Sequence, residues 1–389
     1  MTQADNRIEH EALLLCARTE LKSQSAARLR NLMAEQFDWV YFYKMARRHS
    51  LIPLVYSQLE RSVRELVPPD VLGRFRKDYQ ENAARNLVLT NELTCLVKDS
   101  AAAGIEMIAF KGPALAMFAY DNLALRRFID LDLMVRRADV MGAIRVLKGR
   151  GYSTARRIEI SQQELLLRTQ HNLQFIREKL IVELHWQVSA ELFAASVTAE
   201  ELWDRLITID LNGSEVKTLS VDDLLFSLCV HGSRHLWQRL AWICDVAQIV
   251  PRHDIDWRQL LTRAKQTRAE RMFLLGFRLA TDLFDAQLPE LITAAINSDK
   301  RIASLAAEII QTLFDSDEQK PASSPAIFRY NFLVRKDWRS RARYFLFALT
   351  PTDSDVVAVK LSRRLRFAYY LVRPFRLLVS KRNRKDLKI

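Results

Sequence analysis

The segment from residue 105 to residue 135 constrains the fold more than any other part of this chain. Two apolar runs of strand length, IEMIAF (105–110) and FIDLDLMV (128–135), lie at its two ends. Between them, PALAMFAYDNLA begins with Pro113, and proline suits the first turn of a helix because the amide it lacks has no partner there. The segment therefore predicts a strand, a helix and a second strand in close succession.

The second of these runs carries two carboxylates, Asp130 and Asp132. Side chains two residues apart in a strand point to the same face and leave the backbone about 6.5 Å from each other. Both could then reach a pair of metal ions about 3.5 to 4 Å apart, a geometry that suits nucleotidyl transfer. The alternative is an edge strand whose charges face water, but burial of one face of FIDLDLMV favours a functional pair.

Further strands are expected after a helix over 138–151, which a glycine ends. The runs NLQFIRE (172–178) and KLIVELHWQV (179–188) predict a β-hairpin. Its second strand turns Glu183 and His185 to one face, because they are two residues apart. We therefore expect a mixed sheet flanked by helices.

The remaining sequence has helical spacing, so the predicted class is α+β, a small mixed β-sheet core flanked by largely helical N- and C-terminal regions. Asp38 is a predicted N-cap, and either Ser220 or Asp222 is expected to cap a later helix. Four regions follow: residues 1–98 helical, 99–190 the mixed core, 191–315 helical, and 316–389 a basic C-terminal helical segment.

Composition excludes several classes of protein. The 389 residues are 49% apolar and 27% charged, which is ordinary for a globular chain and excludes a disordered one. Only 9 glycines are present, and neither G-x-x-x-x-G-K-[ST] nor G-x-G-x-x-G occurs, so the P-loop and dinucleotide-binding classes are excluded. The scattered cysteines predict neither a zinc ribbon nor a disulfide framework; they are Cys16, Cys95, Cys229 and Cys244.

The formal charge of +13 comes from the C-terminal end. Residues 329–389 hold 17 Lys or Arg against 4 Asp or Glu, and the rest of the chain is balanced at 42 against 42. Basic and aromatic residues interleave in LRFAYYLVRPFRLLVSKR, a pattern compatible with an amphipathic helix at an anionic membrane surface. The alternative is a helix packed on the body with its arginines facing outward.

The N-terminus, MTQADNRIEHE, is polar and acidic, unlike a signal peptide, and no run approaches the ~18 apolar residues of a membrane span. Together with the unpaired cysteines, this predicts a cytoplasmic protein in a reducing compartment. The basic C-terminal segment adds the expectation of a peripheral position at the inner membrane surface.

The order of these motifs resembles the polymerase-beta-like nucleotidyltransferase superfamily, and more closely the bacterial family of uncharacterised nucleotidyltransferases. The likeness extends over roughly residues 40–380 and depends on several motifs occurring together. They are FKGPAL (110–115), the Tyr120 turn leading to RRFIDLDLMV, the GRGY that ends at Tyr152, VELHW (182–186), HGSRHLWQRLAWICDVA (231–247) and YYLVRPFRLL near the C-terminus.

The resemblance implies a site and a reaction. It implies that Asp130 and Asp132 hold divalent metal with the phosphates of a nucleoside triphosphate, and that Glu183 completes the site and deprotonates an acceptor hydroxyl. The implied reaction is displacement at the α-phosphate with release of pyrophosphate. Mg²⁺ is the natural ion for carboxylates and phosphates, with Mn²⁺ as the alternative. The acceptor is unidentified and could be a small molecule, a protein or an RNA.

For the nucleotide we expect contacts from six further residues: Lys111, Gly112, Arg127, His185, His231 and His235. Members of the superfamily usually have Gly-Ser or Gly-Gly at the start of the first helix, whereas this chain has Lys111-Gly112-Pro113. Because Pro113 has no amide to offer a phosphate, Lys111 is expected to supply the positive charge instead.

Several of these residues have structural alternatives. Lys111 could be a solvated lysine, and Glu183 could pair with Arg126, Arg127 or Arg177. His231 and His235 have the i, i+4 spacing of metal-binding histidines, but Gly232 replaces the Glu of H-E-x-x-H, so helix packing or contact with nucleotide or acceptor is favoured. Trp237 and Trp242 are expected core anchors. Asp245 could pair with Arg239 or reach the cleft.

The sequence thus predicts a metal-dependent nucleotidyltransferase that moves a nucleoside monophosphate from a triphosphate to a hydroxyl acceptor. Two alternatives stay open. One is a catalytically silent nucleotide-binding or interaction scaffold recruited through its basic tail, which the absent Gly-Ser favours. The other is an RNA-binding protein, whose affinity would fall steeply with salt.

Overall fold

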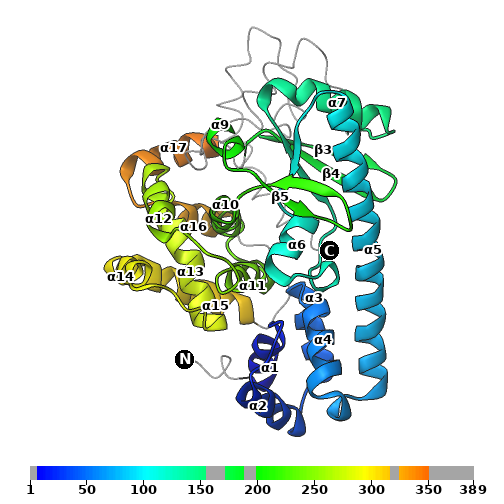
Figure 1. Cartoon of the computed structure of the whole chain (residues 1–389). Helices are drawn as coiled ribbons and strands as arrows, with labels where there is room; N and C mark the ends of the chain where they lie inside the picture. Colours follow the sequence, from blue (N-terminus) through cyan, green and yellow to red (C-terminus); the bar gives the residue numbers. More distant parts are fainter. Residues whose placement is uncertain (1–6, 155–170, 188–198, 316–323, 350–389) are drawn as a thin grey trace, which may run out of the picture.

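The computed structural model describes residues 7–154, 171–187, 199–315 and 324–349 of the chain. It confirms the α+β class, because one small mixed sheet lies among many helices (Figure 1). The N-terminal part is helical, as expected: α1 (Ile8–Cys16), α2 (Ser23–Ala34), α3 (Trp39–Arg48), α4 (Ile52–Ser62) and α5 (Pro69–Ala102).

The sheet and its connections occupy the middle of the chain. Its elements are β1 (Met107–Ala109), α6 (Pro113–Tyr120), β2 (Leu131–Val135), α7 (Val140–Gly149), β3 (Asn172–Arg177) and β4 (Leu180–His185). The rest comprises α9 (Ala199–Trp203), β5 (Ile207–Asp210), β6 (Glu215–Thr218), α10 (Val221–Arg234), α11 (Leu240–Ile249), α12 (Trp257–Gln266), α13 (Glu270–Phe284), α14 (Glu290–Ser298), α15 (Lys300–Phe314), α16 (Ser324–Leu333) and α17 (Trp338–Leu349).

The expected helix caps are present. Asp38 Oδ1 accepts a hydrogen bond from Tyr41 N at 2.9 Å and so caps α3. Of the two candidates for α10, Ser220 is the cap, since its hydroxyl accepts from the amide of Asp223 at 3.3 Å. Each cap satisfies an amide that the first turn of a helix leaves without a partner.

The four-stranded sheet has the order β1-β2-β4-β3. β1 is antiparallel to β2, β2 is parallel to β4, and β3 and β4 form the predicted antiparallel hairpin. The predicted strand over 128–135 is shorter than expected, because β2 begins at Leu131. Asp132 therefore lies in the strand, whereas Asp130 lies at a bend just before it.

The two faces of this sheet pack against different parts of the molecule. One hydrophobic cluster contains Leu133 of β2 and Leu184 of β4 together with Leu93 of α5. Met134 of β2 belongs to the other cluster, with residues of the helical body such as Ile243 of α11. Because alternate residues of a strand point to opposite faces, α5 and α7 cover one face and the other turns toward α10 and α11 (Figure 1).

One hairpin was not expected, since residues 191–315 were predicted to be helical throughout. β5 and β6 pair antiparallel across a turn at Asn212 and Gly213, which have φ of 53° and 79°. Positive φ at both central residues is typical of a tight hairpin turn, and Asn-Gly is its commonest sequence. The short strands have too few apolar residues to outweigh the helical spacing around them.

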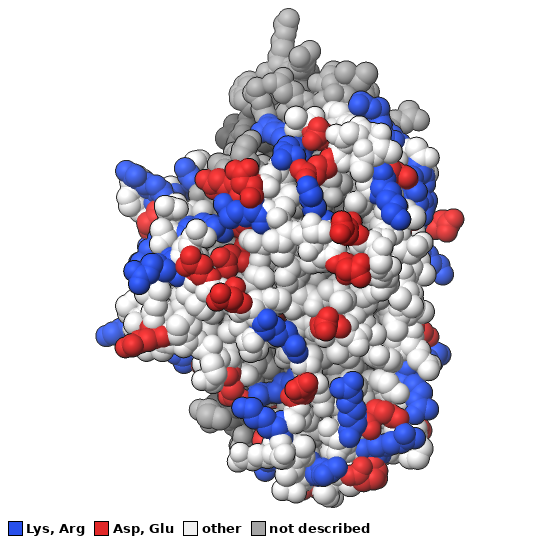
Figure 2. Space-filling model, viewed as in Figure 1, with Lys and Arg blue, Asp and Glu red and all other residues white. Residues whose placement is uncertain are grey.

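The charge excess predicted for the C-terminal end falls mostly on residues 350–389, which lie outside the described residues. On the face drawn in Figure 2, lysine and arginine side chains are interspersed with acidic ones. Within the described part of the chain, no helix has the length and apolar character needed to cross a membrane.

Candidate active site

The candidate site is on the sheet face that turns toward the helical body. Asp132 of β2 is in register with Glu183 of β4, and His185 follows two residues later on the same strand. Residues paired across parallel strands point to the same side of the sheet, so these three side chains project together. Their neighbours Leu133 and Leu184 point into the opposite face and anchor the two strands.

The side chains make direct contacts. Lys111 Nζ donates to Asp132 Oδ1 at 3.2 Å, and His185 Nε2 lies 3.1 Å from the same oxygen. His185 Nε2 is also 3.4 Å from Glu183 Oε2, which accepts a further hydrogen bond from Asn172 Nδ2 at 2.9 Å. His185 therefore bridges the two carboxylates.

The charges in this group stabilise one another. Burial alone would raise the pKa of Asp132, which is 8% exposed, but Lys111 and His185 together hold that pKa well below its usual range. Burial opposes protonation of His185, yet its bonds to Asp132 and Glu183 raise its pKa above the usual value. The hydrogen bond from His185 lowers the pKa of Glu183. The group thus consists of ionised carboxylates held by two cations.

Asp130 completes the predicted carboxylate set without a direct contact of this kind. Burial, with the negative charges of Asp132 and Glu183, raises its pKa to about 6. A carboxylate with this pKa is short of positive charge, which a bound cation would supply.

These residues fit a divalent metal. Ligand atoms of Asp132, Glu183 and His185 all lie within 4.8 Å of one another. Mg²⁺ prefers oxygen ligands, so two carboxylates with a histidine bind it less well than an all-oxygen set would. The same three ligands also suit Mn²⁺. The raised pKa of Asp130 beside this group is a second observation in favour of a cation. The predicted set was Asp130, Asp132 and Glu183, so the structure adds His185 to the candidates.

The structure contradicts the structural alternatives that the sequence left open for Asp132 and Lys111, and two of the three that it left open for Glu183. Asp132 is buried, so the pair does not lie on a water-facing edge. The Lys111 side chain is 14% exposed and bonded to Asp132, so it is not a solvated lysine. Arg126 pairs with Asp245, and Arg177 with Glu92, so neither of these arginines takes the carboxylate of Glu183.

Gly112 joins β1 to α6 at the edge of the site. Its φ of 53° and ψ of −123° are accessible to glycine and strained for other residues. A Cβ there would lie 3.4 Å from the carbonyl oxygen of Asp130. The turn thus brings the residue before α6 close to the backbone of Asp130, and Pro113 removes one amide from the first turn of the helix, as the sequence indicated.

His231 and His235 lie at the end of α10, on the helical side of the site. Their ring centroids are 4.6 Å apart, and they lie 5.3 Å and 5.5 Å from Trp242. Burial lowers the pKa of His231 well below its usual value and that of His235 to about 4, with Lys111 contributing to both shifts. These contacts support a role of both histidines in helix packing. Both rings lie close enough to Lys111 for its charge to lower their pKa values.

The glycine between the histidines has a packing reason. A Cβ on Gly232 would clash with the ring of Trp237, so only glycine lets this ring pack against α10. Trp237 is fully buried, as expected of a core anchor, and Trp242 is partly buried beside the histidines. The motif HGSRHLW thus fixes the end of α10 against the turn that follows it.

Arg234 and His171 were missed by the sequence analysis. Arg234 Nη1 lies 2.9 Å from His171 Nε2, and burial with the charge of Arg234 lowers the pKa of His171 to about 3, so the ring is neutral and accepts the bond. The charge of Glu183 acts on Arg234, which places this guanidinium near the site. The signal was present in HGSRH, where the histidine pair drew attention from the arginine.

Asp245 locks the helical body to the loop before β2. Arg126 Nη2 donates to Asp245 Oδ2 at 3.1 Å, Arg126 Nε to both carboxylate oxygens, and Tyr120 Oη to Oδ1 at 2.8 Å. Asp245 is 1% exposed and pairs with Arg126 rather than Arg239. The Tyr120 turn and the loop that carries Asp130 are therefore fixed to α11.

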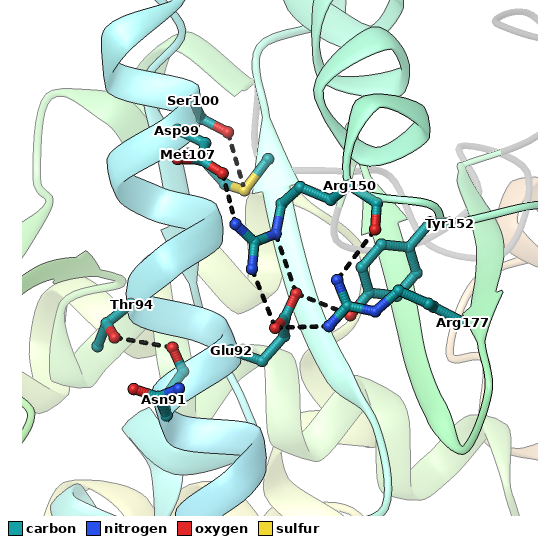
Figure 3. A network of polar contacts seen from close by, with 9 residues as sticks. All are labelled: Asn91, Glu92, Thr94, Asp99, Ser100, Met107, Arg150, Tyr152 and Arg177. Atoms are coloured by element: carbon teal, nitrogen blue, oxygen red, sulfur yellow. Dashed lines mark hydrogen bonds and ion pairs between the residues drawn. The ribbon is translucent and has the colours of Figure 1, made fainter.

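The GRGY motif serves a second buried network, on the far face of the sheet (Figure 3). Glu92 of α5 accepts hydrogen bonds from Arg150 at 3.2 Å, from Tyr152 at 3.1 Å and from Arg177 at 2.8 Å. Arg150 also donates to Asp99 at 2.6 Å. This network ties α5 to the end of α7 and to β3, and so supports the strands that carry the site.

Arg127 lies apart from the carboxylates. It is exposed, whereas Phe128 beside it is buried and Arg126 is partly buried. Burial and the charges of Arg85, Arg239 and Arg47 lower its pKa, and no site carboxylate is among the charges that act on it most strongly. The structure therefore brings together the predicted residues around Asp132, with His231 and His235 at the helical side, and the nucleotide contact predicted for Arg127 stays a prediction.

Comparison with known proteins agrees with this site. No curated protein matches the chain. The sequence profile of a family described as uncharacterised nucleotidyltransferase matches residues 35–285, which is more than half of the chain and includes every residue of the site. The chain therefore belongs to this nucleotidyltransferase family.

Proposed function

We propose that this protein is a metal-dependent nucleotidyltransferase that moves a nucleoside monophosphate from a nucleoside triphosphate to a hydroxyl acceptor. The proposal includes membership of the polymerase-beta-like superfamily. The observation that carries it is the register of Asp132 with Glu183 across β2 and β4, with Asp130 beside them. Together with the family match, this pattern favours chemistry at a phosphate.

In the proposed reaction, an oxygen of the acceptor forms a bond to the α-phosphorus. The bond from that phosphorus to the bridging oxygen breaks, and pyrophosphate leaves with the electron pair. The acceptor proton passes to the carboxylate of Glu183, which the structure holds through His185 and Asn172. Glu183 is partly exposed, so an acceptor can approach it.

Asp130, Asp132 and Glu183 would hold the metal, and His185 is available as a further ligand once it loses its proton. When bound, Mg²⁺ or Mn²⁺ supplies charge neutralisation for the phosphates and polarises the α-phosphate. In the protein alone, Lys111 and His185 balance the charge of Asp132.

The nucleotide phosphates would be held by positive charge from two elements. Lys111 and Gly112 lie at the start of α6, where amides and the helix dipole favour anions. Arg234 is the last residue of α10, next to His235 in the chain, and the charge of Glu183 acts on it. We assign Arg234 to the triphosphate, since a guanidinium binds phosphate oxygens in a bidentate manner.

The test is magnesium-dependent transfer from an α-labelled triphosphate, with deproteinised cell extract as the source of acceptors. Asp132→Asn and Asp130→Asn are each expected to lower pyrophosphate release about a thousandfold, because each removes charge that the metal and phosphates need. Circular dichroism checks that both variants fold.

Asp121→Asn is the matched control. Asp121 is exposed and has a φ of 49°, a conformation that asparagine tolerates, so this variant is expected to keep full activity. Wild-type rates in Asp130→Asn or Asp132→Asn would contradict the proposal.

The second candidate, a silent nucleotide-binding scaffold, is favoured by Pro113 at the start of α6 and by the Lys111–Asp132 pair, which already neutralises one carboxylate. Calorimetry with each triphosphate and Mg²⁺ separates the two candidates. Binding that depends on Asp132 without any pyrophosphate release from the extract would support the scaffold.

A further inference from the structure

We propose that Arg47, Arg85, Arg127 and Arg239 form a binding site for a phosphate group carried by the acceptor. These four residues are called the arginine cluster below. The assignment to the acceptor depends on the proposed nucleotidyl transfer, whereas the binding of phosphate does not. The acceptor would then be a phosphorylated small molecule with a free hydroxyl.

One half of the arginine cluster lies where α3 meets α11. Arg47 is in the last turn of α3, and Arg239 directly precedes α11. The two elements are bonded to each other, since the amide of Leu240 donates to His49 Nδ1 at 3.2 Å and Arg239 Nη1 donates to Ser50 Oγ at 3.4 Å. Arg47 and Arg239 are both exposed.

The other half lies where α5 meets the loop before β2. Asn86 Nδ2 donates to the carbonyl oxygen of Arg126 at 2.8 Å, and Asn82 Nδ2 donates to the same oxygen at 3.3 Å. Arg85 precedes Asn86 on the helix, and Arg127 follows Arg126 in the loop. These bonds hold the backbone beside Arg85 against the backbone beside Arg127, and the charge of Arg85 acts on Arg127.

The two halves adjoin each other. Arg126 is bonded to Asp245 of α11, which fixes the loop against the helix that Arg239 precedes. The charges of Arg85, Arg239 and Arg47 all act on Arg127. In Figure 1, α3 lies between α5 and α11, so the four arginines come from α3, α5, the residue before α11 and the loop before β2.

Acidic residues do not balance this charge. In the described part of the chain, none of the four arginines has a carboxylate within ion-pair distance. Among the charges that act most strongly on Arg127, the negative one is Asp78, and Asp78 accepts a hydrogen bond from Tyr43 Oη at 2.6 Å. Like charges held together repel each other, so a bound anion would stabilise the arrangement. Guanidinium groups match the geometry of phosphate oxygens.

We assign this anion to the acceptor and not to the nucleotide triphosphate, because no carboxylate of the site is among the charges that act most strongly on Arg127. Arg127 is exposed beside buried Phe128, so its side chain is accessible to a ligand. It is three residues from Asp130 in the chain, and three residues span at most about 10 Å. A ligand with its phosphate at the arginine cluster can therefore place a nearby hydroxyl at the carboxylates.

The test is calorimetric titration of the full chain with inorganic phosphate, and separately with triphosphate and Mg²⁺. The main variant is Arg47→Gln/Arg239→Gln, whose two positions are exposed and whose fold is checked by circular dichroism. We expect phosphate affinity to fall at least about tenfold, the effect of losing one charge-assisted hydrogen bond. Triphosphate affinity is expected to stay within about twofold of wild type.

Two controls complete the design. Arg137→Gln removes an exposed arginine outside the cluster and is expected to keep phosphate affinity. Asp132→Asn is expected to lose the triphosphate and to keep phosphate at the arginine cluster. Unchanged phosphate affinity in Arg47→Gln/Arg239→Gln would overturn the anion site, and an equal loss of triphosphate would overturn its assignment to the acceptor.

A third arm tests RNA. Tight binding of a single-stranded RNA oligonucleotide, lost in the same double variant and falling steeply with salt, would replace the small acceptor with RNA and overturn the proposal. If wild type binds phosphate at the cluster and binds no triphosphate, the nucleotidyl transfer fails and the anion site stands.

Discussion

Asp132 shows how a buried carboxylate keeps its charge in this protein. Its Oδ1 receives bonds from both Lys111 and His185, and these cations outweigh the cost of burial. Asp130, two residues earlier, has no such pair of partners, and its pKa is raised. The pKa values of these two carboxyl groups thus shift in opposite directions, because Asp132 is hydrogen-bonded to the cations and Asp130 is not.

The raised pKa of Asp130 predicts a stability change with pH. The folded-state pKa of about 6 exceeds the unfolded value of 3.8, so the folded protein loses stability as pH rises through this window and Asp130 ionises. Asp130→Asn removes the ionisation. In the absence of metal, we expect this variant to exceed wild type in free energy of unfolding by about 2 kcal/mol at pH 8 and to match it below pH 4.

Urea unfolding at both pH values measures this difference, with Asp121→Asn as the control that should follow wild type. Adding Mg²⁺ at pH 8 is expected to stabilise wild type more than Asp130→Asn, because only wild type keeps the full carboxylate set. A difference between wild type and Asp130→Asn that is the same at pH 4 and pH 8 would contradict the assignment of the raised pKa.

The residues that gather around Asp132 could largely be predicted from the sequence, because the geometry of a strand decides which side chains share a face. Alternation along a strand placed Glu183 and His185 on one face, and the structure has them there beside Asp132. Arg234 could not be found this way, since its contact with His171 joins segments that lie far apart in the sequence. The spacing of residues in the sequence also does not show which carboxylate contacts which cation, so the pairing of Asp132 with Lys111 could not be predicted.

At the scale of elements, the network around Glu92 holds three of them together. Glu92 is 6% exposed and is bonded to Arg150, Tyr152 and Arg177 (Figure 3). Glu92→Gln keeps the shape and removes the charge, which leaves two arginines without their main counter-charge. We expect the free energy of unfolding to fall by about 3 kcal/mol.

Asp99→Asn is the matched control for that substitution. Asp99 also binds Arg150, but its side chain is 46% exposed, so water screens the pair and the loss should stay under about 1 kcal/mol. Chemical denaturation of both variants measures the two values. Equal losses in the two variants would show that burial does not decide the strength of these pairs.

Elements were predicted well where local signals were strong. The apolar runs gave the strands β1 to β4, and Asp38 and Ser220 gave two helix starts. The β5–β6 hairpin was missed although Asn212-Gly213 is a strong turn signal, because its short strands alternate weakly and lie among helical sequence. The strand predicted from residue 128 begins only at Leu131. Backbone pairing decides where a strand begins, and the side-chain pattern does not show it.

At the scale of the whole molecule, α5 belongs to both hydrophobic clusters. Leu72 and Phe75 near its start pack into the helical body, and Leu89 and Leu93 pack under the sheet. The helix has 34 residues, which is about 50 Å of continuous hydrogen-bonded backbone. No sequence pattern showed that the two clusters would share one helix, since periodicity describes a helix and not what each part of it contacts.

This sharing predicts a single unfolding transition for the described part of the chain. Loss of either cluster exposes half of α5, and an exposed half-helix is marginal in water. We expect far-UV circular dichroism and tryptophan fluorescence to report the same midpoint in thermal and urea unfolding. Two separated midpoints would show that the clusters unfold independently.

The length of α5 also decides how this protein can be divided. A protease cut within α5, or a split of the gene there, would leave each fragment with half of the helix and an exposed apolar surface. Neither fragment is therefore expected to stay soluble alone. Co-expression of the two fragments is expected to give an active complex, because each fragment covers the apolar surface that the other exposes.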